Sequence, residues 1–246
     1  LPYRYGVSER NPNLFFTSTE GMNLGALNPT RTLIVADPRL QRFPPHLFRE
    51  DNTFIGATRP LAAAPSLAWL KAAQASPLRG TGARAWISTA DGGGQTLAWV
   101  ADYSTPILEA HGVALDTSAS LPAALAGSQL AIIAAHGQVV PDGQYFQIVA
   151  DEGDFAVSAA EFAQGLRNVG VVVLFVCSAG RADTHPTSNT TVGLAKQLLD
   201  RGCSAVIASP WPLRAVVPAI WLPKFLESWD KNDPVIDCVY EANRAV

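Results

Sequence analysis

The sequence contains few cysteines and few charged residues, and each of these low contents excludes certain classes of protein. Three of its 246 residues are cysteine, and 16% are charged, with 18 basic and 21 acidic side chains. Three cysteines without a Cys-x-x-Cys spacing argue against a disulfide scaffold or a zinc ribbon and favour a reducing, cytoplasmic compartment. Because no Lys/Arg block is present, we expect no direct nucleic-acid binding.

Long apolar runs and several familiar motifs are also missing. No apolar run reaches the length of a membrane span, so we expect no membrane insertion. The sequence has no G-x-S-x-G elbow and no G-x-G-x-x-G, and Gly92–Gly94 are not followed by the Lys of a phosphate loop. We therefore expect neither a cofactor nor a metal.

Short apolar runs alternate with helical patterns, which predicts an α/β protein with a mostly parallel sheet covered on both faces. The chain is 48% hydrophobic and long enough to bury a large core. The expected strands are 32–36, 84–88, 130–135, 145–150, 171–176 and 205–208. The expected helices are 65–75, with Pro65 in its first turn, 95–110, interrupted near Pro106, 121–125, 158–167, 191–201, 215–229 and 234–245.

Residues 1–30 carry two turn-prone Asn-Pro pairs, which predict an irregular or short-stranded lead-in. We expect residues 31–246 to form the functional domain. The chain begins with Leu1 rather than Met, so we expect it to be part of a longer protein.

Two of the apolar runs end in residues that can carry chemistry. The run LAIIAA ends at His136-Gly137, and the run VVVLFV ends at Cys177-Ser178-Ala179-Gly180. Functional groups of open α/β sheets collect at the carboxyl ends of the strands. A thiol and an imidazole at one edge are the parts of a cysteine nucleophile site.

The other histidines and cysteines of the chain lack the sequence context of His136 and Cys177. His111-Gly112 ends a helical pattern, where both residues are ordinary capping, whereas His136-Gly137 follows a strand. Cys203 and Cys238 fit inert packing. His185 is a second imidazole candidate, ranked below His136, and His46 lies in a Pro-bearing loop.

The order of these motifs resembles the CHAT-domain family, which is related to caspases and separase. The match extends beyond the thiol and the imidazole and covers about residues 32–246 in order. It consists of the segments DPRL with Phe43-Pro44, APSLAWL (64–70), LAIIAAHG (130–137), VVLFVCSAG (172–180), GLAKQLL (193–199), AVIASPWP (205–212) and the closing helix from Pro234.

The resemblance implies a caspase-like three-layer α/β/α sandwich with peptide hydrolysis by a Cys177–His136 dyad. In such a site, the backbone N–H groups of Gly137 and Cys177 hold the oxyanion. The substrate would be a protein or peptide. Relatives are often fused to TPR repeats and restrained until an upstream sensor region or a partner signals, and we expect the same regulation here.

One segment departs from the family pattern. Trp211-Pro212-Leu213 is followed by Arg214 and Ala215, where relatives carry acidic residues thought to receive a basic P1 side chain. P1 is the substrate residue whose carbonyl is attacked. A basic residue there repels Arg or Lys, so we expect an apolar or acidic P1. The alternative is that Arg214 points to solvent and an acid such as Asp183 or Asp154 lines the pocket.

Two rival functions remain. A catalytically inactive scaffold is compatible with the unusual Phe175-Val176 and Arg214-Ala215 pairs. A flavodoxin-like ligand-binding domain accounts for a parallel sheet but leaves the ordered thiol and imidazole unexplained.

Overall fold

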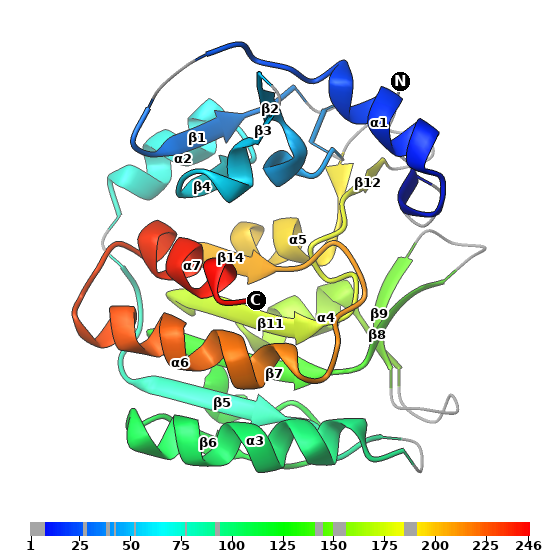
Figure 1. The fold of residues 1–246 in the computed structure, drawn as a ribbon. Helices are drawn as coiled ribbons and strands as arrows, with labels where there is room; N and C mark the ends of the chain where they lie inside the picture. Colours follow the sequence, from blue (N-terminus) through cyan, green and yellow to red (C-terminus); the bar gives the residue numbers. More distant parts are fainter. Residues whose placement is uncertain are drawn as a thin grey trace.

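A parallel sheet of five strands forms the centre of the molecule (Figure 1). Its order is β14-β11-β7-β5-β6, and every neighbouring pair is parallel. The strands are β5 (Ala83–Ile87), β6 (Ala114–Asp116), β7 (Leu130–Ala135), β11 (Val171–Val176) and β14 (Ala205–Ala208). The expected parallel sheet is thereby confirmed.

The coordinates are a computed structural model. The residues it describes are 8–26, 29–37, 40–41, 43–51, 53–76, 78–91, 94–140, 145–149, 156–184 and 191–246. The candidate residues Asp154 and His185 lie outside this described part of the chain.

Helices cover both faces of the central sheet. In Figure 1, α3 (Thr96–Ala110), α6 (Val217–Asp230) and α7 (Val235–Arg244) lie in front of it, and α4 (Ala159–Gly165) and α5 (Leu194–Asp200) lie behind. This arrangement confirms the three-layer α/β/α fold. Among the described residues, we find no helix with the length and apolar character needed to cross a bilayer.

The alternation of side chains along the strands explains the three layers. All six residues of β7 are buried, as they must be when helices cover both faces. Ile133 packs in a cluster with Phe162 of α4, whereas its neighbour Ile132 packs in the opposite cluster with Phe225 of α6. Successive side chains thus enter the two cores in turn.

Smaller elements surround this centre. The N-terminal part of the chain lies above β14 in Figure 1 and forms α1 (Pro12–Glu20), β1 (Thr32–Val35), β2 (Arg49–Glu50), β3 (Thr53–Phe54), β4 (Leu61–Ala64) and α2 (Leu67–Gln74). The remaining strands are β8 (Gly137–Val140), β9 (Tyr145–Val149), β10 (Ala156–Ser158), β12 (Asp183–Thr184) and β13 (Thr191–Val192). The 3₁₀ helices are η1 (Ser8–Arg10), η2 (Pro45–Leu47), η3 (Ile55–Ala57) and η4 (Ala123–Leu125).

The prediction of an irregular N-terminal lead-in is wrong for residues 12–20, which form α1. The Asn11-Pro12 pair starts this helix rather than a turn. The Asn11 side chain accepts a hydrogen bond from the Leu14 N–H at 3.1 Å. Pro12 occupies the first helical position, where its missing N–H costs nothing.

Two other helix boundaries also differ from expectation. Helix α3 continues through Pro106, because this residue lies on the exposed face, where solvent can replace the lost hydrogen bond. Helix α5 begins at Leu194 instead of 191, because Thr191–Val192 pairs with Asp183–Thr184 as a strand.

The structure also differs from expectation at the start of α2 and in the segment 121–125. Pro65 precedes the N-cap of α2 instead of entering its first turn, because the Ser66 hydroxyl accepts from the Trp69 N–H. The expected helix at 121–125 is reduced to η4, a single 3₁₀ turn.

The expected helix ends at Ser158 and His111 are confirmed. Ser158 and Glu161 form both hydrogen bonds of a capping box at the start of α4. His111 ends α3, and Gly112 follows with a φ of 66°, a left-handed conformation that glycine adopts without strain.

Candidate active site

The register of the central sheet brings the two predicted residues to neighbouring strand ends. Strands β11 and β7 are parallel, and their last paired residues are Val176 and Ala135. Cys177 and His136 are the next residues on each strand, and both are half-buried. Gly137 follows His136 and begins β8. The thiol and the imidazole therefore leave adjacent strands in the same direction and at the same level.

A tight turn follows Cys177 and fixes its backbone. Ser178 has a φ of 61°, which is uncommon for a residue other than glycine. Its N–H donates to the Trp211 carbonyl at 3.1 Å, and the Gly180 N–H donates to the Ser209 carbonyl at 2.9 Å. The segment after β14 therefore holds the turn in place. Strained backbone of this kind persists only where the surrounding structure over-determines it.

The same segment contacts the sulfur directly. The Leu213 N–H donates to the Cys177 Sγ at 3.4 Å. This backbone contact holds the sulfur, the atom that would act as the nucleophile, against the segment after β14. The sulfur is thus positioned by two neighbouring strands, its own β11 and the adjacent β14.

His136 has an acidic partner that is not among the residues expected from the sequence. The Asp91 Oδ1 lies 2.5 Å from the His136 Nε2, and the Asp91 side chain is only 10% exposed. Asp91 follows β5, the strand that borders β7 on the side away from β11. The sequence offers one signal for Asp91, an acidic residue shortly after a buried strand. This signal points to His136 only when the order of the strands is known, because β5 must border β7.

The other two cysteines and His46 differ from the candidate pair. Cys203 is 2% exposed and Cys238 is fully buried. Burial raises the pKa of each thiol to about 11. His46 lies in η2, where burial lowers its pKa. Cys177 is therefore the most accessible of the three thiols.

The four residues expected to line a substrate pocket have different surroundings. Trp211 packs against the N-terminal cluster that contains Phe43, and Ala215 packs against the cluster that contains Leu97, in the first turn of α3. Arg214 is exposed and directly follows the Leu213 that contacts the sulfur. Asp183 begins β12, and only its backbone is described.

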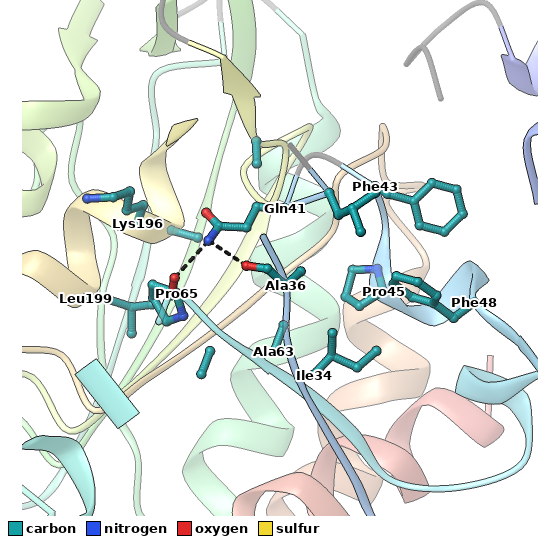
Figure 2. Close-up of a pocket in the computed structure, with 14 residues that line it drawn as sticks. Ile34, Ala36, Gln41, Phe43, Pro45, Phe48, Ala63, Pro65, Lys196 and Leu199 are labelled. Carbon is teal, nitrogen blue, oxygen red and sulfur yellow. Dashed lines mark hydrogen bonds between the residues drawn. The ribbon is translucent and has the colours of Figure 1, made fainter. Parts of the chain in front are cut away.

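A separate cavity of about 150 Å³ lies between the N-terminal strands and α5 (Figure 2). Its lining is mainly apolar, and the Gln41 amide donates to the carbonyls of Ala36 and Pro65 at 3.2 and 2.8 Å. Cys177 and His136 do not line it. Within the described residues, no group of three or more potential ligands is arranged to hold a metal ion.

Comparison with known proteins assigns the chain to a family. No curated protein matches it. The family model of the CHAT domain matches residues 21–246, which is most of the sequence. The chain therefore belongs to the CHAT-domain family, whose members are related to caspase-like cysteine peptidases.

Proposed function

We propose that this chain is a cysteine endopeptidase that hydrolyses a specific protein substrate. The observation that carries the proposal is the register of β7 and β11, which places Cys177 and His136 at adjacent strand ends. The relationship of the CHAT family to cysteine peptidases supports the same conclusion.

The proposed chemistry uses only residues of this chain. The Cys177 thiolate attacks the scissile carbonyl and forms a thioester acyl-enzyme. The backbone N–H groups of Gly137 and Cys177 stabilise the oxyanion that develops. His136 takes the thiol proton and donates it to the leaving amine. It then removes a proton from the water that hydrolyses the thioester, which restores the thiol.

The surroundings of Phe175 give its departure from the family pattern a structural explanation that does not require an inactive scaffold. The sequence departs from the family here, yet the Phe175 ring packs edge-on against Trp221 with centroids 5.7 Å apart. This substitution thus serves the core beneath the site. Free cysteines fit a cytoplasmic enzyme, and an upstream sensor region or a partner would control its activity.

Selective alkylation of Cys177 tests the proposal. At pH 7, a thiol with a pKa near 11 is ionised in only about one molecule in 10⁴. Cys203 and Cys238 should therefore react slowly with iodoacetamide, in addition to being buried. We expect a single fast modification in the intact mass, lost in Cys177→Ala and slowed in His136→Ala.

Matched variants make this measurement decisive. The Cys203→Ala and Cys238→Ala proteins should retain the single fast modification. If Cys177 reacted no faster than the two buried thiols, the chain would be better described as an inactive scaffold.

The residue after Leu213 leads to a prediction about specificity. Arg214 is exposed and directly follows Leu213, whose N–H contacts the sulfur, and we propose that its charge faces the P1 side chain of the substrate. Peptides with Arg or Lys at P1 should be cleaved at least about tenfold more slowly than peptides with an acidic or apolar P1. A P1 peptide library measures this ratio.

Charge reversal provides the matched test of specificity. Arg214→Glu should raise cleavage after Arg, whereas reversal of the exposed Arg201 after α5 should leave the profile unchanged. Efficient cleavage after Arg or Lys by the wild-type protein would refute the role of Arg214.

A further inference from the structure

A buried carboxylate joins the candidate histidine to the start of helix α3. The two oxygens of Asp91 have different partners. Oδ1 lies 2.5 Å from the His136 Nε2, and Oδ2 accepts a hydrogen bond from the Leu97 N–H at 2.9 Å. Asp91 therefore contacts the proposed catalytic group on one side and a fixed helix end on the other.

The backbone around Asp91 restricts its position. The Ser88 N–H donates to the Ala134 carbonyl at 2.9 Å, which continues the pairing of β5 with β7 beyond Ile87. The Gly94 N–H donates to the Asp91 carbonyl at 2.7 Å, which closes a turn before the helix. The carboxylate thus has a defined distance to the His136 ring because both residues follow neighbouring strands.

The start of helix α3 provides the second partner of the carboxylate. The residue at its N-cap position, Gln95, makes no side-chain capping hydrogen bond, and the first turn holds no acidic residue. Asp91 supplies the missing acceptor from outside the helix, since its Oδ2 accepts from the Leu97 N–H. An ionised carboxylate only accepts hydrogen bonds, so the ring nitrogen that it contacts must carry a hydrogen.

We propose that Asp91 is a positioning residue that holds His136 with its Nε2 protonated and its Nδ1 free to accept the Cys177 proton. When the proton moves from the thiol to Nδ1, the negative charge of Asp91 stabilises the imidazolium. This inference rests on the proposed function, since it assigns the orientation of the same histidine.

An exchange of aspartate for asparagine separates this role from capping. In Asp91→Asn, the amide oxygen can still accept from the Leu97 N–H, while the amide nitrogen donates to Nε2. The ring then carries its hydrogen on Nδ1 and cannot accept the thiol proton. We expect ¹⁵N NMR of the His136 ring to report this change of tautomer, with little change in the unfolding temperature.

The kinetic effect should fall on kcat. With the fastest substrate of the P1 library, Asp91→Asn should lower kcat by about 10- to 100-fold and leave KM nearly unchanged. This is less than the ~10⁴-fold effect of the same exchange in a Ser-His-Asp triad, because a thiol gives up its proton more readily than a hydroxyl. Asp102→Asn, at an exposed position of α3, is the matched control and should behave as wild type.

A second variant excludes a purely structural role. Asp91→Ala combined with Gln95→Ser restores a capping side chain to α3 but leaves His136 without its partner. We expect this protein to recover stability relative to Asp91→Ala while its kcat stays low. Recovery of both the stability and kcat would overturn the positioning role of Asp91.

The tautomer measurement also separates this inference from the proposed function. A wild-type protein that failed to hydrolyse any peptide would count against the peptidase proposal, yet its His136 tautomer could still be measured. The wild-type tautomer retained in Asp91→Asn would overturn the role of Asp91 regardless of activity.

Discussion

Replacing Cys177 by alanine should lower kcat/KM for peptide hydrolysis by at least about a thousandfold, because no other nucleophile can form the thioester. His136→Ala should have an effect of similar size, since the proton of the thiol and that of the leaving amine both pass through this ring. The two losses should not add in the double variant, because both residues serve the same step. The measurement is hydrolysis of the fastest peptide of the P1 library.

A matched cysteine variant controls for general damage. Cys238 is fully buried in the core beneath α6 and α7, so Cys238→Ala should lower the free energy of unfolding by about 1–2 kcal/mol. Its hydrolytic rate should nonetheless remain close to that of the wild type. Equal loss of hydrolysis in Cys177→Ala and Cys238→Ala would mean that the effect is structural and that Cys177 is not the nucleophile.

The second large effect is expected at Gly180, which closes the turn after the proposed nucleophile. A Cβ atom built on Gly180 would lie 2.5 Å from the Ala208 carbonyl oxygen and 3.0 Å from the Ser209 carbonyl carbon. These contacts are with backbone, so the side chain cannot avoid them by rotating. Gly180→Ala must therefore push apart the Cys177 turn and the segment after β14.

Displacement at this point should be costly for catalysis. The Leu213 N–H that contacts the Cys177 Sγ belongs to the displaced segment. We expect Gly180→Ala to lower kcat/KM by at least about a hundredfold, since a shift near 1 Å can cost that much. Its free energy of unfolding should fall by about 1–3 kcal/mol, as is typical of an overpacked interior.

Gly21→Ala provides the comparison for Gly180→Ala. Gly21 has a φ of −66°, and its added Cβ would be 4.0 Å from the nearest atom, so the substitution should be tolerated. Unfolding by denaturant and hydrolysis of the same peptide measure both variants. A fully active Gly180→Ala protein would show that the contact between these two segments does not position the sulfur.

Local patterns in the sequence correctly predict most of the elements that carry the site. An apolar run that stops at His136-Gly137 and another that stops at Cys177 are recognisable because a strand covered on both faces must be continuously apolar. The capping box at Ser158 and the helix end at His111 are equally local, since the groups that bond lie within a few residues of one another.

The incorrect predictions concern residue types that serve two purposes. Asn-Pro is typical of a turn, yet the Asn11-Pro12 pair caps α1, and the choice between the two depends on the residues after the pair. Proline is typical of a helix interruption, but the cost of Pro106 depends on whether its helix face is exposed, which is a property of packing. Whether such a residue caps, continues or interrupts a helix therefore depends on its surroundings as well as on its type.

The sequence by itself determined which residues could react, because the thiol, the imidazole and their strand ends are encoded locally. Only the tertiary structure decided which residues contact the thiol and the imidazole. Asp91 contacts His136 because β5 borders β7, and Leu213 contacts Cys177 because β14 borders β11. The order of strands results from how helices cover both faces of the whole sheet, so no single segment could reveal these partners.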